Sequence, residues 1–236
     1  MKCIRIVMLA LFFVHSPVQA SSELVFAQIV NTPDQRVGAQ IIEAAYAKLG
    51  YTVRTVEMPG KRALKESSSG RLDGEVHRIF EIADEYTSLV RVPTPLNYIE
   101  SAVFTRDQDF TVTDCQALDA YAVGIVGGVK HAEICVVGLR DVQVFGTSEK
   151  MMKLLNLGRI QLAITAKVNG QVLVSQMKLS GIKPLSPALR KMPVYHYLHR
   201  KHRDLVPQID AVFQEMQRSG ELEQLRQQAV QEQLEQ

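Results

Sequence analysis

Apolar and polar positions in the first third of the chain follow two alternating periods. Residues 23–30 (ELVFAQIV) form a short apolar run, and residues 51–58 (YTVRTVEM) alternate, as strands do. Between them, residues 35–50 (QRVGAQIIEAAYAKLG) carry apolar side chains at helical spacing and end at glycine. Residues 59–70 (PGKRALKESSSG) start with Pro and end with Gly, as a short helix does, and residues 71–76 (RLDGEV) return to a strand. This β-α-β-α-β order predicts a parallel sheet with right-handed crossovers.

The second half of the chain repeats this order after a connecting segment. The predicted elements are strand, helix, strand, helix and strand, over residues 120–126, 129–138, 142–146, 147–158 and 159–165. Gly127 and Gly128 join the first of these strands to its helix. Thr147 or Ser148 is a suitable N-cap for the second helix, and Gly158 is a suitable C-cap. The chain is therefore predicted to be an α/β protein with two similar sheets.

One local element occurs once in each unit. Residues 61–76 (KRALKESSSGRLDGEV) and 148–165 (SEKMMKLLNLGRIQLAIT) both read as a helix that stops at Gly-Arg and continues into an apolar strand. We expect Gly70 and Gly158 to end these helices in a left-handed turn. If each lobe of a two-lobed protein holds one copy, the two sets of strand ends face one cleft, because ligands of open α/β sheets lie beyond the carboxyl ends of the strands. The alternative is that the segments share only the rules of helix capping.

Residues 1–20 have the pattern of a secretory signal peptide. A basic start is followed by an apolar run, and Val18 and Ala20 stand at the −3 and −1 positions of a cleavage site. The alternative is an uncleaved anchor, but a membrane-spanning helix needs about 20 apolar residues. We therefore expect a mature chain of residues 21–236 in the periplasm.

Composition and charge narrow the possible partners. Hydrophobic residues make up 46% of the chain and charged residues 22%, which is ordinary for a globular protein. The chain has 27 Lys and Arg against 25 Asp and Glu, and Lys2 and Arg5 of the leader account for the difference, so the mature chain is formally neutral. A neutral chain has no electrostatic basis for binding nucleic acid or an anionic membrane. We expect no nucleic acid partner and a ligand held by local groups.

Two cysteines remain after removal of the leader. An even count in an exported chain predicts a disulfide between Cys115 and Cys135, closing a loop of about 20 residues. Two separate buried thiols are the alternative. The spacing of a four-ligand cysteine and histidine site is absent, so we expect neither a metal site nor a cofactor.

Five segments of the chain, in this order, resemble one known family. They are MPGKRALKESSSGRLDGE, LVRVPTPL, AYAVGIVGGVKHAE, LLNLGRIQLAIT and LVPQIDAVFQEMQRSGELEQL, and the resemblance covers residues 21–226. They are similar to segments of the extracytoplasmic solute-binding proteins of bacterial ABC transporters, in the family (family 3) that includes polar amino acid receptors. The resemblance implies the two-lobed periplasmic binding protein fold, in which each lobe is a mostly parallel sheet flanked by helices and two hinge crossovers join the lobes.

The resemblance also implies domain boundaries and a function. Lobe one would comprise residues 21–105 and 188–236, and lobe two residues 106–187. The lobes would close on a small solute that bears a carboxylate, such as an amino acid or a related compound. The protein would act as a monomer and deliver this solute to the membrane permease of an ABC transporter.

Two other functions are compatible with this fold class. The protein could instead be a ligand sensor that presents its closed form to a membrane signalling protein. It could also be a cleft enzyme of the dehydratase type, with Glu75, His77 and His131 as candidate acids and bases. The sequence shows no pairing of a nucleophile with a base and no Gly-x-Ser-x-Gly motif. We therefore expect no enzyme activity.

Arg78 is the first candidate for a ligand contact. The resemblance implies that an Arg after the Gly-x-x-Asp strand of lobe one grips the α-carboxylate, and Arg78 in GRLDGEVHRIF stands near that place, without the usual Thr-x-x-Arg context. The planar guanidinium suits a carboxylate because it offers two parallel charge-assisted hydrogen bonds. The alternative is a salt bridge from Arg78 to Glu75 or Glu81.

The sequence departs from amino acid receptors in lobe two. The resemblance implies an Asp that holds the ammonium at the end of the comparable strand, but Thr165 or Ala166 stands there in GRIQLAITAKV. A buried ammonium without a carboxylate is poorly stabilised. Either another acid holds it, such as Glu57, Asp73 or Glu75, or the ligand lacks an ammonium.

Four further residues are candidate ligand contacts. Arg62 begins a predicted helix, and Gly127 opens another whose free N–H groups would attract an anion. Thr147 and Thr165 carry hydroxyls near the cleft side of lobe two. Arg62, Gly127 and Thr147 each have a structural alternative, namely a solvated helix face, a simple turn and an N-cap.

Overall fold

The computed structural model describes residues 22–235 of the chain, so the predicted signal peptide lies outside the described residues. The strands are β1 (Glu23–Ile29), β2 (Thr52–Met58), β3 (Gly74–Ile79), β4 (Leu89–Arg91), β5 (Asn97–Thr105), β6 (Val123–Val126), β7 (Val142–Phe145), β8 (Leu162–Ala166), β9 (Lys183–Pro184) and β10 (Arg190–His199). The helices are α1 (Pro33–Ala47), α2 (Gly60–Ser68), α3 (Ile82–Glu85), α4 (Lys130–Cys135), α5 (Ser148–Asn156), α6 (Lys167–Gln176), α7 (Val206–Ser219) and α8 (Glu221–Glu235), with 3-10 turns η1 (Gln116–Leu118) and η2 (Arg200–Leu205).

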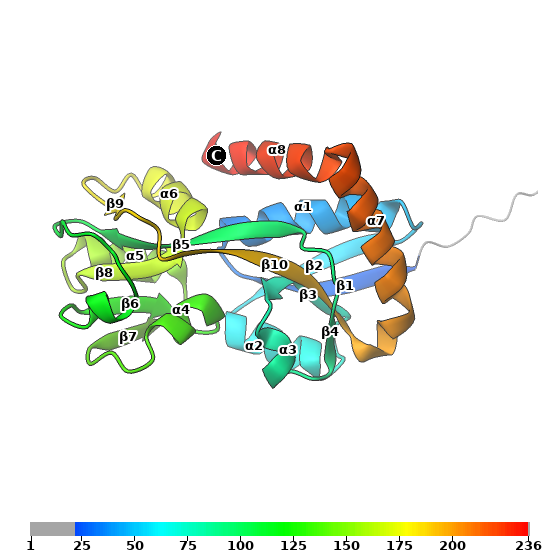
Figure 1. The fold of residues 1–236 in the computed structure, drawn as a ribbon, viewed down its shortest axis with the longest axis horizontal. Helices are drawn as coiled ribbons and strands as arrows, with labels where there is room; N and C mark the ends of the chain where they lie inside the picture. The colour runs from blue at the N-terminus through cyan, green and yellow to red at the C-terminus, as the bar shows by residue number, and fades with distance from the viewer. Residues whose placement is uncertain (1–21, 236) are drawn as a thin grey trace, which may run out of the picture.

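Two parallel groups of strands are joined by two long antiparallel strands. The strand order is β2-β1-β3-β10-β5-β8-β6-β7, with β1 parallel to β2 and β3, and β6 parallel to β7 and β8. In the middle, β5 and β10 pair antiparallel from Arg190 opposite Ser101 to Val194 opposite Asn97. Figure 1 shows β5 and β10 running between two bodies of helices and strands. The prediction of a two-lobed α/β fold is confirmed, but the strands of both lobes form one continuous ten-stranded sheet instead of two separate sheets, because β5 and β10 pair with each other and with β8 and β3.

Each lobe is defined by its elements. Lobe one contains β1–β4, α1–α3, α7 and α8, and lobe two contains β6–β9 and α4–α6. The predicted boundaries near residues 105 and 188 fall beside the end of β5 and the start of β10. Strands β5 and β10 connect the two lobes.

Each lobe has its own apolar core. In lobe one, Phe26 of β1, Tyr46 of α1 and Phe213 of α7 are fully buried in one cluster. Lobe two has two clusters, one containing Phe104 and the other its neighbour Val103. Because successive side chains of a strand point to opposite faces, these clusters cover both faces of the sheet around β5. Each lobe is therefore a layered α/β body with its own core, as the alternating sequence pattern predicts.

The repeated helix–Gly-Arg–strand element forms in both lobes. Gly70 follows α2 with φ of 79°, and Gly158 follows α5 with φ of 66°, so both adopt the predicted left-handed conformation. Thr147 is the N-cap of α5, and its side chain accepts a hydrogen bond from the backbone N–H of Lys150 at 3.3 Å. The element is thus the same local structure in two places, and its strand enters the sheet in each.

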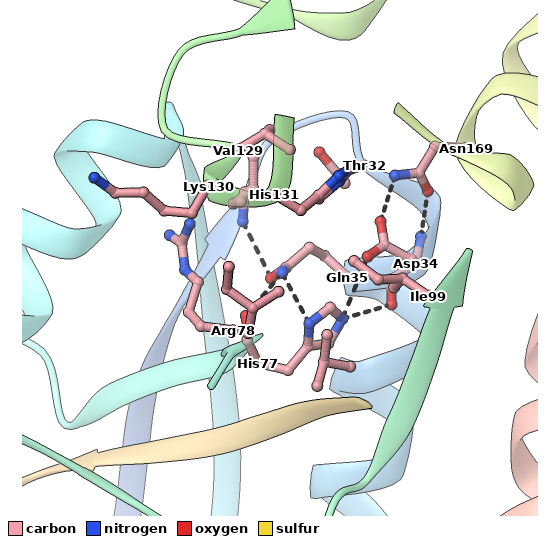
Figure 2. Close-up of a pocket in the computed structure, with 13 residues that line it drawn as sticks. Thr32, Asp34, Gln35, His77, Arg78, Ile99, Val129, Lys130, His131 and Asn169 are labelled. Atoms are coloured by element: carbon pink, nitrogen blue, oxygen red, sulfur yellow. Dashed lines mark hydrogen bonds and ion pairs between the residues drawn. The ribbon is translucent and has the colours of Figure 1, made fainter. Parts of the chain in front are cut away.

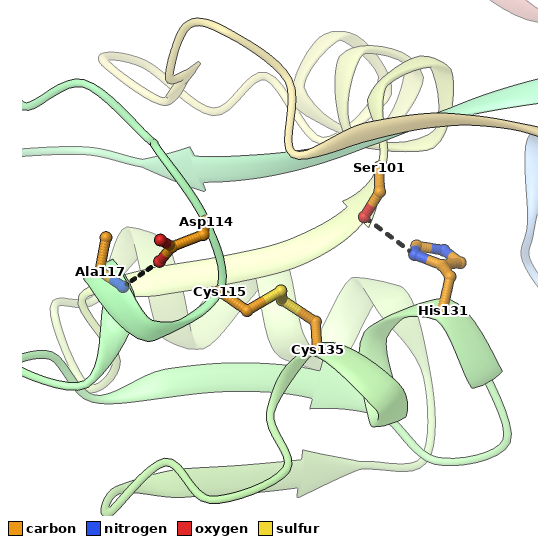
Figure 3. Close-up of a disulfide and its surroundings, with 6 residues drawn as sticks. All are labelled: Ser101, Asp114, Cys115, Ala117, His131 and Cys135. Carbon is orange, nitrogen blue, oxygen red and sulfur yellow. Dashed lines mark hydrogen bonds between the residues drawn. A yellow bond between two sulfur atoms is a disulfide. The ribbon is translucent and has the colours of Figure 1, made fainter.

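Cys115 and Cys135 form the predicted disulfide, which ties the segment before η1 to the last residue of α4 (Figure 3). Within residues 22–235, no group of three or more His, Cys, Asp or Glu side chains is arranged to hold a metal ion. In that same part of the chain, no helix combines the length and the apolar character needed to cross a bilayer.

Candidate functional site

A small cavity lies where the two lobes meet (Figure 2). Its volume is about 40 Å³, and it is lined by Ile29, Thr32, Asp34, Gln35, His77, Arg78, Ile79, Ile99, Val129, Lys130, His131, Asn169 and Val194. The lining comes from the carboxyl ends of β1 and β3 and the start of α1 in lobe one, from the starts of α4 and α6 in lobe two, and from the connecting strands β5 and β10. This is the place where parallel α/β sheets bind ligands. The volume holds roughly three waters, at 10–15 Å³ each.

The first connection across the cavity joins Asp34 of lobe one to Asn169 of lobe two. The backbone N–H of Asp34 donates to Asn169 Oδ1 at 2.8 Å, and Asn169 Nδ2 donates to Asp34 Oδ1 at 2.5 Å. Both side chains are buried. Asp34 stands in the first turn of α1, where a carboxylate is stabilised by the helix dipole. Within residues 22–235, no lysine or arginine forms a salt bridge with this carboxylate.

His77 lies beside Asp34 and is neutral. Its Nε2 is 3.0 Å from the carbonyl oxygen of Asp34, which only accepts, so Nε2 carries the proton. Nδ1 then accepts from Gln35 Nε2 at 3.3 Å, and the same amide donates to the His77 carbonyl at 3.0 Å. Burial lowers the pKa of His77, although the nearby Asp34 carboxylate opposes the shift. His77 therefore supplies no positive charge to Asp34, and its Nε2 stands 3.6 Å from Asp34 Oδ2.

Arg78 is buried at the edge of the cavity, and most of its donors are committed. Nε and Nη2 both lie 2.8 Å from Glu75 Oε2, while Ser67 Oγ lies 2.6 Å from Glu75 Oε1. Nη2 also donates to Gly60 O at 3.3 Å, and Nη1 donates to Gly128 O at 3.0 Å. A guanidinium has five N–H groups, so a single one, on Nη1, remains for another acceptor. The alternative salt bridge to Glu75, considered from the sequence, is present.

Glu75 is enclosed completely. Burial raises the pKa of its carboxyl group, and Arg78 and the Ser67 hydroxyl oppose that shift. Replacing either partner of such a buried pair leaves an uncompensated charge, which costs several kcal/mol. Glu75 thus fixes the position of Arg78 and is not available to a solute.

Lobe two contributes a second histidine to the cavity. His131 of α4 has its Nδ1 3.0 Å from Ser101 Oγ of β5 (Figure 3), and burial lowers its pKa to about 4. Next to it, Lys130 Nζ pairs with Glu85 Oε2 of lobe one at 2.8 Å and with Glu133 at 3.4 Å. The charge of Lys130 is therefore met by acids at the rim, and lobe two presents neutral groups to the cavity.

The other predicted ligand residues lie elsewhere. The side chain of Arg62 is 69% exposed on α2 and 3.8 Å from Glu66. The N–H of Gly127 donates to Phe145 O at 2.9 Å, so it is already bonded. Thr147 caps α5, and Thr165 is buried in β8 opposite Ala102. Of the predicted set, Arg78 alone lines the cavity among the described residues. The ligand roles stay predictions.

The acids considered for an ammonium are also placed elsewhere. Glu57 accepts from Gln28 at 3.1 Å and stands 3.7 Å from Arg36. Asp73 accepts from the N–H of Val25 at 2.7 Å, and it pairs with basic side chains of η2. The acid in the cavity is Asp34, which the sequence reasoning missed. Its signal was available, because Asn-Thr-Pro-Asp follows the first strand, where ligand residues of α/β sheets are found.

A larger hollow adjoins the cavity at Asp34. It has a volume of about 340 Å³, and Asp34 and Ile99 line both spaces. The wider space also borders Lys167 and Gln171 of α6 and Arg226 of α8. Separation of Asn169 from Asp34 would therefore add room next to the carboxylate.

Comparison with solved structures shows the fold. A histidine kinase sensor domain with similarity to periplasmic binding proteins gives a TM-score of 0.76 at 17% identity, covering 88% of this chain and 96% of that chain. An amino acid ABC transporter substrate-binding protein from Streptococcus pneumoniae, bound to L-arginine, gives 0.76 at 14% identity, covering 91% and 97%. An ancestral arginine-binding protein bound to glutamine gives 0.74 at 17% identity, covering 89% and 98%.

Comparison of sequences shows the family. An uncharacterised protein of Shewanella oneidensis is 28% identical over 192 residues, which are 78% of this chain and 72% of that protein. The profile of the bacterial extracellular solute-binding proteins, family 3, matches residues 30–232. With a two-lobed fold and a polar cavity between the lobes, this match identifies the chain as a member of the bacterial extracellular solute-binding proteins of family 3.

Proposed function

We propose that this protein is a periplasmic receptor that closes its lobes on a small amino compound, an amino acid or a close relative, and delivers it to an ABC permease. The cationic nitrogen of the solute would pair with Asp34. A carboxylate oxygen would accept the remaining Nη1 N–H of Arg78. Asn169 and His131 would close over the solute from lobe two.

One observation carries this proposal: the carboxylate of Asp34 is buried at the lobe boundary, and among residues 22–235 it has no lysine or arginine partner, only the neutral His77 at 3.6 Å. A buried charge without a partner of opposite sign is costly, and a cationic ligand removes that cost. The amide of Asn169 is a neutral partner that a stronger cationic donor would replace. Because the cavity holds only a few waters, the solute enters when the lobes separate and Asn169 leaves Asp34.

A thermal-shift screen tests the solute class. The panel contains L-arginine, L-lysine, L-histidine, L-glutamine and agmatine, with succinate and acetate as acids that lack a cationic nitrogen. At about one hundred times Kd, binding adds roughly 2.7 kcal/mol of stability, which a melting curve resolves. We expect at least one amino compound to raise Tm and the two acids to leave it unchanged. A shift by the acids alone would contradict the proposal.

Single substitutions then test the proposed ligand contacts of Asp34 and Arg78. Asp34→Asn should remove binding of the amino compound found in the screen, whereas Glu57→Gln, a matched change of a lobe-one carboxylate outside the cavity, should retain it. Arg78→Ala should weaken binding of a carboxylate-bearing solute relative to its amine analogue. Equal affinity of Arg78→Ala and wild type for that solute would show that Arg78 does not hold the carboxylate.

A sensor role is the second candidate, favoured by the close fold match to a histidine kinase sensor domain. Deletion of the gene separates the two roles. Loss of uptake of the radiolabelled solute supports delivery to a permease, and loss of solute-induced transcription with uptake intact supports sensing. Mass spectrometry of the purified periplasmic protein tests export, because cleavage after Ala20 leaves a chain that starts at Ser21.

A further inference from the structure

The two lobes touch backbone to backbone at a pair of glycines. Gly60 is the first residue of α2 in lobe one, and Gly128 lies in the turn between β6 and α4 in lobe two. A Cβ on Gly60 would lie 3.0 Å from the carbonyl carbon and oxygen of Gly128. A Cβ on Gly128 would lie 2.4 Å from the backbone nitrogen of Lys61. A side chain at either position would therefore meet the main chain of the opposite lobe.

Arg78 holds this contact from within lobe one. Its Nη1 donates to Gly128 O at 3.0 Å and its Nη2 donates to Gly60 O at 3.3 Å, so one guanidinium bonds the carbonyls of both lobes. The side chain is 4% exposed, and Glu75 anchors it. Because Nε and Nη2 of the planar guanidinium are held by Glu75, Nη1 has little freedom to follow the carbonyl oxygen of Gly128 if lobe two moves. The position of Gly128 relative to lobe one is therefore set closely.

Other contacts between the lobes are more compliant. Lys130 and Glu85 pair at 2.8 Å at the rim, where the Glu85 side chain is 55% exposed. The bond of Asn169 to Asp34 uses a side chain of lobe two that can change rotamer. A backbone cannot yield in this way. The glycine contact is thus stiffer than these two side-chain contacts.

We propose that Gly60, Gly128 and Arg78 form a closure seat, which sets how far the lobes close and so limits the size of the solute that the closed cavity accepts. The seat deepens the proposed function, because it rests on a closing motion of the two lobes. It makes Gly60 and Gly128 specificity-determining residues that touch no solute. It also gives Arg78 a role in positioning lobe two.

The experiment measures closure without any solute. Spin labels are placed on exposed residues of each lobe, through Lys65→Cys on α2 and Leu157→Cys after α5, in the mature, disulfide-bonded protein. Pulsed dipolar spectroscopy gives the distribution of label-to-label distances. Gly60→Ala and Gly60→Val are then introduced as a graded series, because Gly60 does not have a positive φ and substitution there adds no backbone strain.

We expect the wild type to populate the short distance of the closed structure, Gly60→Ala to reduce that population, and Gly60→Val to lose it. Gly146→Ala is the matched control, since a Cβ there has no atom within 4 Å, and it should leave the distribution unchanged. Cooperative urea unfolding should show that the Gly60 variants remain folded, with a stability lower than that of the wild type only by the contribution of the lost closed form. A short-distance population retained in Gly60→Val, or missing from wild type, would overturn the seat. Solute binding is not a readout of this experiment, so failure of the solute screen and failure of the seat are distinct results.

Discussion

In lobe one, the α2–Gly70–β3 element carries charged groups to the cleft, because β3 contains Glu75, His77 and Arg78. In lobe two, the matching α5–Gly158–β8 element ends in apolar residues and Thr165, and the next polar group at the cavity is the amide of Asn169. The two elements share the left-handed glycine after the helix and the entry of the next strand into the sheet. They differ in the chemistry at the strand ends.

This difference suggests that lobe one supplies the charged contacts to the solute and lobe two supplies neutral ones. Asp34, whose carboxylate has no lysine or arginine partner, and Arg78, which keeps one spare N–H, both belong to lobe one. Lys130 of lobe two also lines the cavity, but its charge is met by Glu85 and Glu133. Lobe two offers Asn169 and the neutral His131. A solute with charges would gain most of its polar contacts from lobe one, and closure of lobe two would then exclude water. Exclusion of water strengthens the charged contacts already made.

The largest expected effect comes from the buried ion pair that lobe two lacks. Glu75→Gln leaves the Arg78 guanidinium buried without its counter-charge, and we expect a loss of about 3–5 kcal/mol in the free energy of unfolding. Thr165→Val in the matching strand of lobe two should cost about 1 kcal/mol or less. Urea unfolding of both variants measures the contrast. Equal losses would show that the charged pair does not distinguish the lobes.

The disulfide is the next feature that separates the lobes, because it constrains lobe two alone. The double variant Cys115→Ser, Cys135→Ser removes a cross-link between residues 20 apart in sequence. In the chain-entropy model, a loop of this length contributes roughly 3 kcal/mol. We expect that loss in urea unfolding, together with a matching loss when the wild type is reduced. No change on reduction would contradict the expected contribution.

Each lobe buries a histidine whose ionisation should make stability depend on pH. Burial lowers the pKa of His196 in β10 and of His131 in α4 to about 4, below the value of about 6.5 in an unfolded chain. As pH falls from about 6.5 towards 4, the unfolded chain binds the proton first, so stability is full above this window and falls within it by about 1.4 kcal/mol per pH unit for each histidine.

Replacement of one histidine tests this slope. His131→Gln should reduce the pH dependence of the free energy of unfolding by about 1.4 kcal/mol per pH unit between pH 6 and 4.5. His199→Gln serves as the control, because His199 is only partly buried and should contribute less. An unchanged slope in His131→Gln would mean that His131 is not held neutral in the folded state.

The smallest expected effect compares the two glycine caps. Alanine in the left-handed region costs about 1–2 kcal/mol at either position. A Cβ on Gly70 would also lie 2.9 Å from the His199 ring, whereas one on Gly158 would meet only the flexible end of Arg106 at 3.6 Å. We therefore expect Gly70→Ala to exceed Gly158→Ala by about 1 kcal/mol, because crowding adds to the backbone strain. Thermal or urea unfolding of the pair measures the difference, and the reverse order would contradict it.

The two β-α-β-α-β units, the two lobes, the left-handed turns at Gly70 and Gly158 and the disulfide could be predicted from the sequence. The elements α3, β4, β9 and α6, the last of which carries Asn169, were not predicted. Periodicity, capping residues and cysteine count act over a few residues or through composition, so they are visible without coordinates. The site was predicted less completely. Arg78 does line the cavity. The sequence predicted that its guanidinium would form two hydrogen bonds to a ligand carboxylate, but Glu75 already occupies that part of the guanidinium.

Tertiary structure alone decided which polar groups meet. Asp34 and Asn169 are 135 residues apart in the chain, and Arg78 and Gly128 are 50 apart, so no local pattern pairs them. These contacts depend on how the lobes are oriented around β5 and β10. The sequence by itself determined two α/β bodies with strand ends facing a cleft. The packing of the two lobes against each other places Asp34 in the cavity and Arg78 at the contact between the lobes. Only the tertiary structure decides this, because burial and charge neutralisation depend on distances that only the folded chain defines.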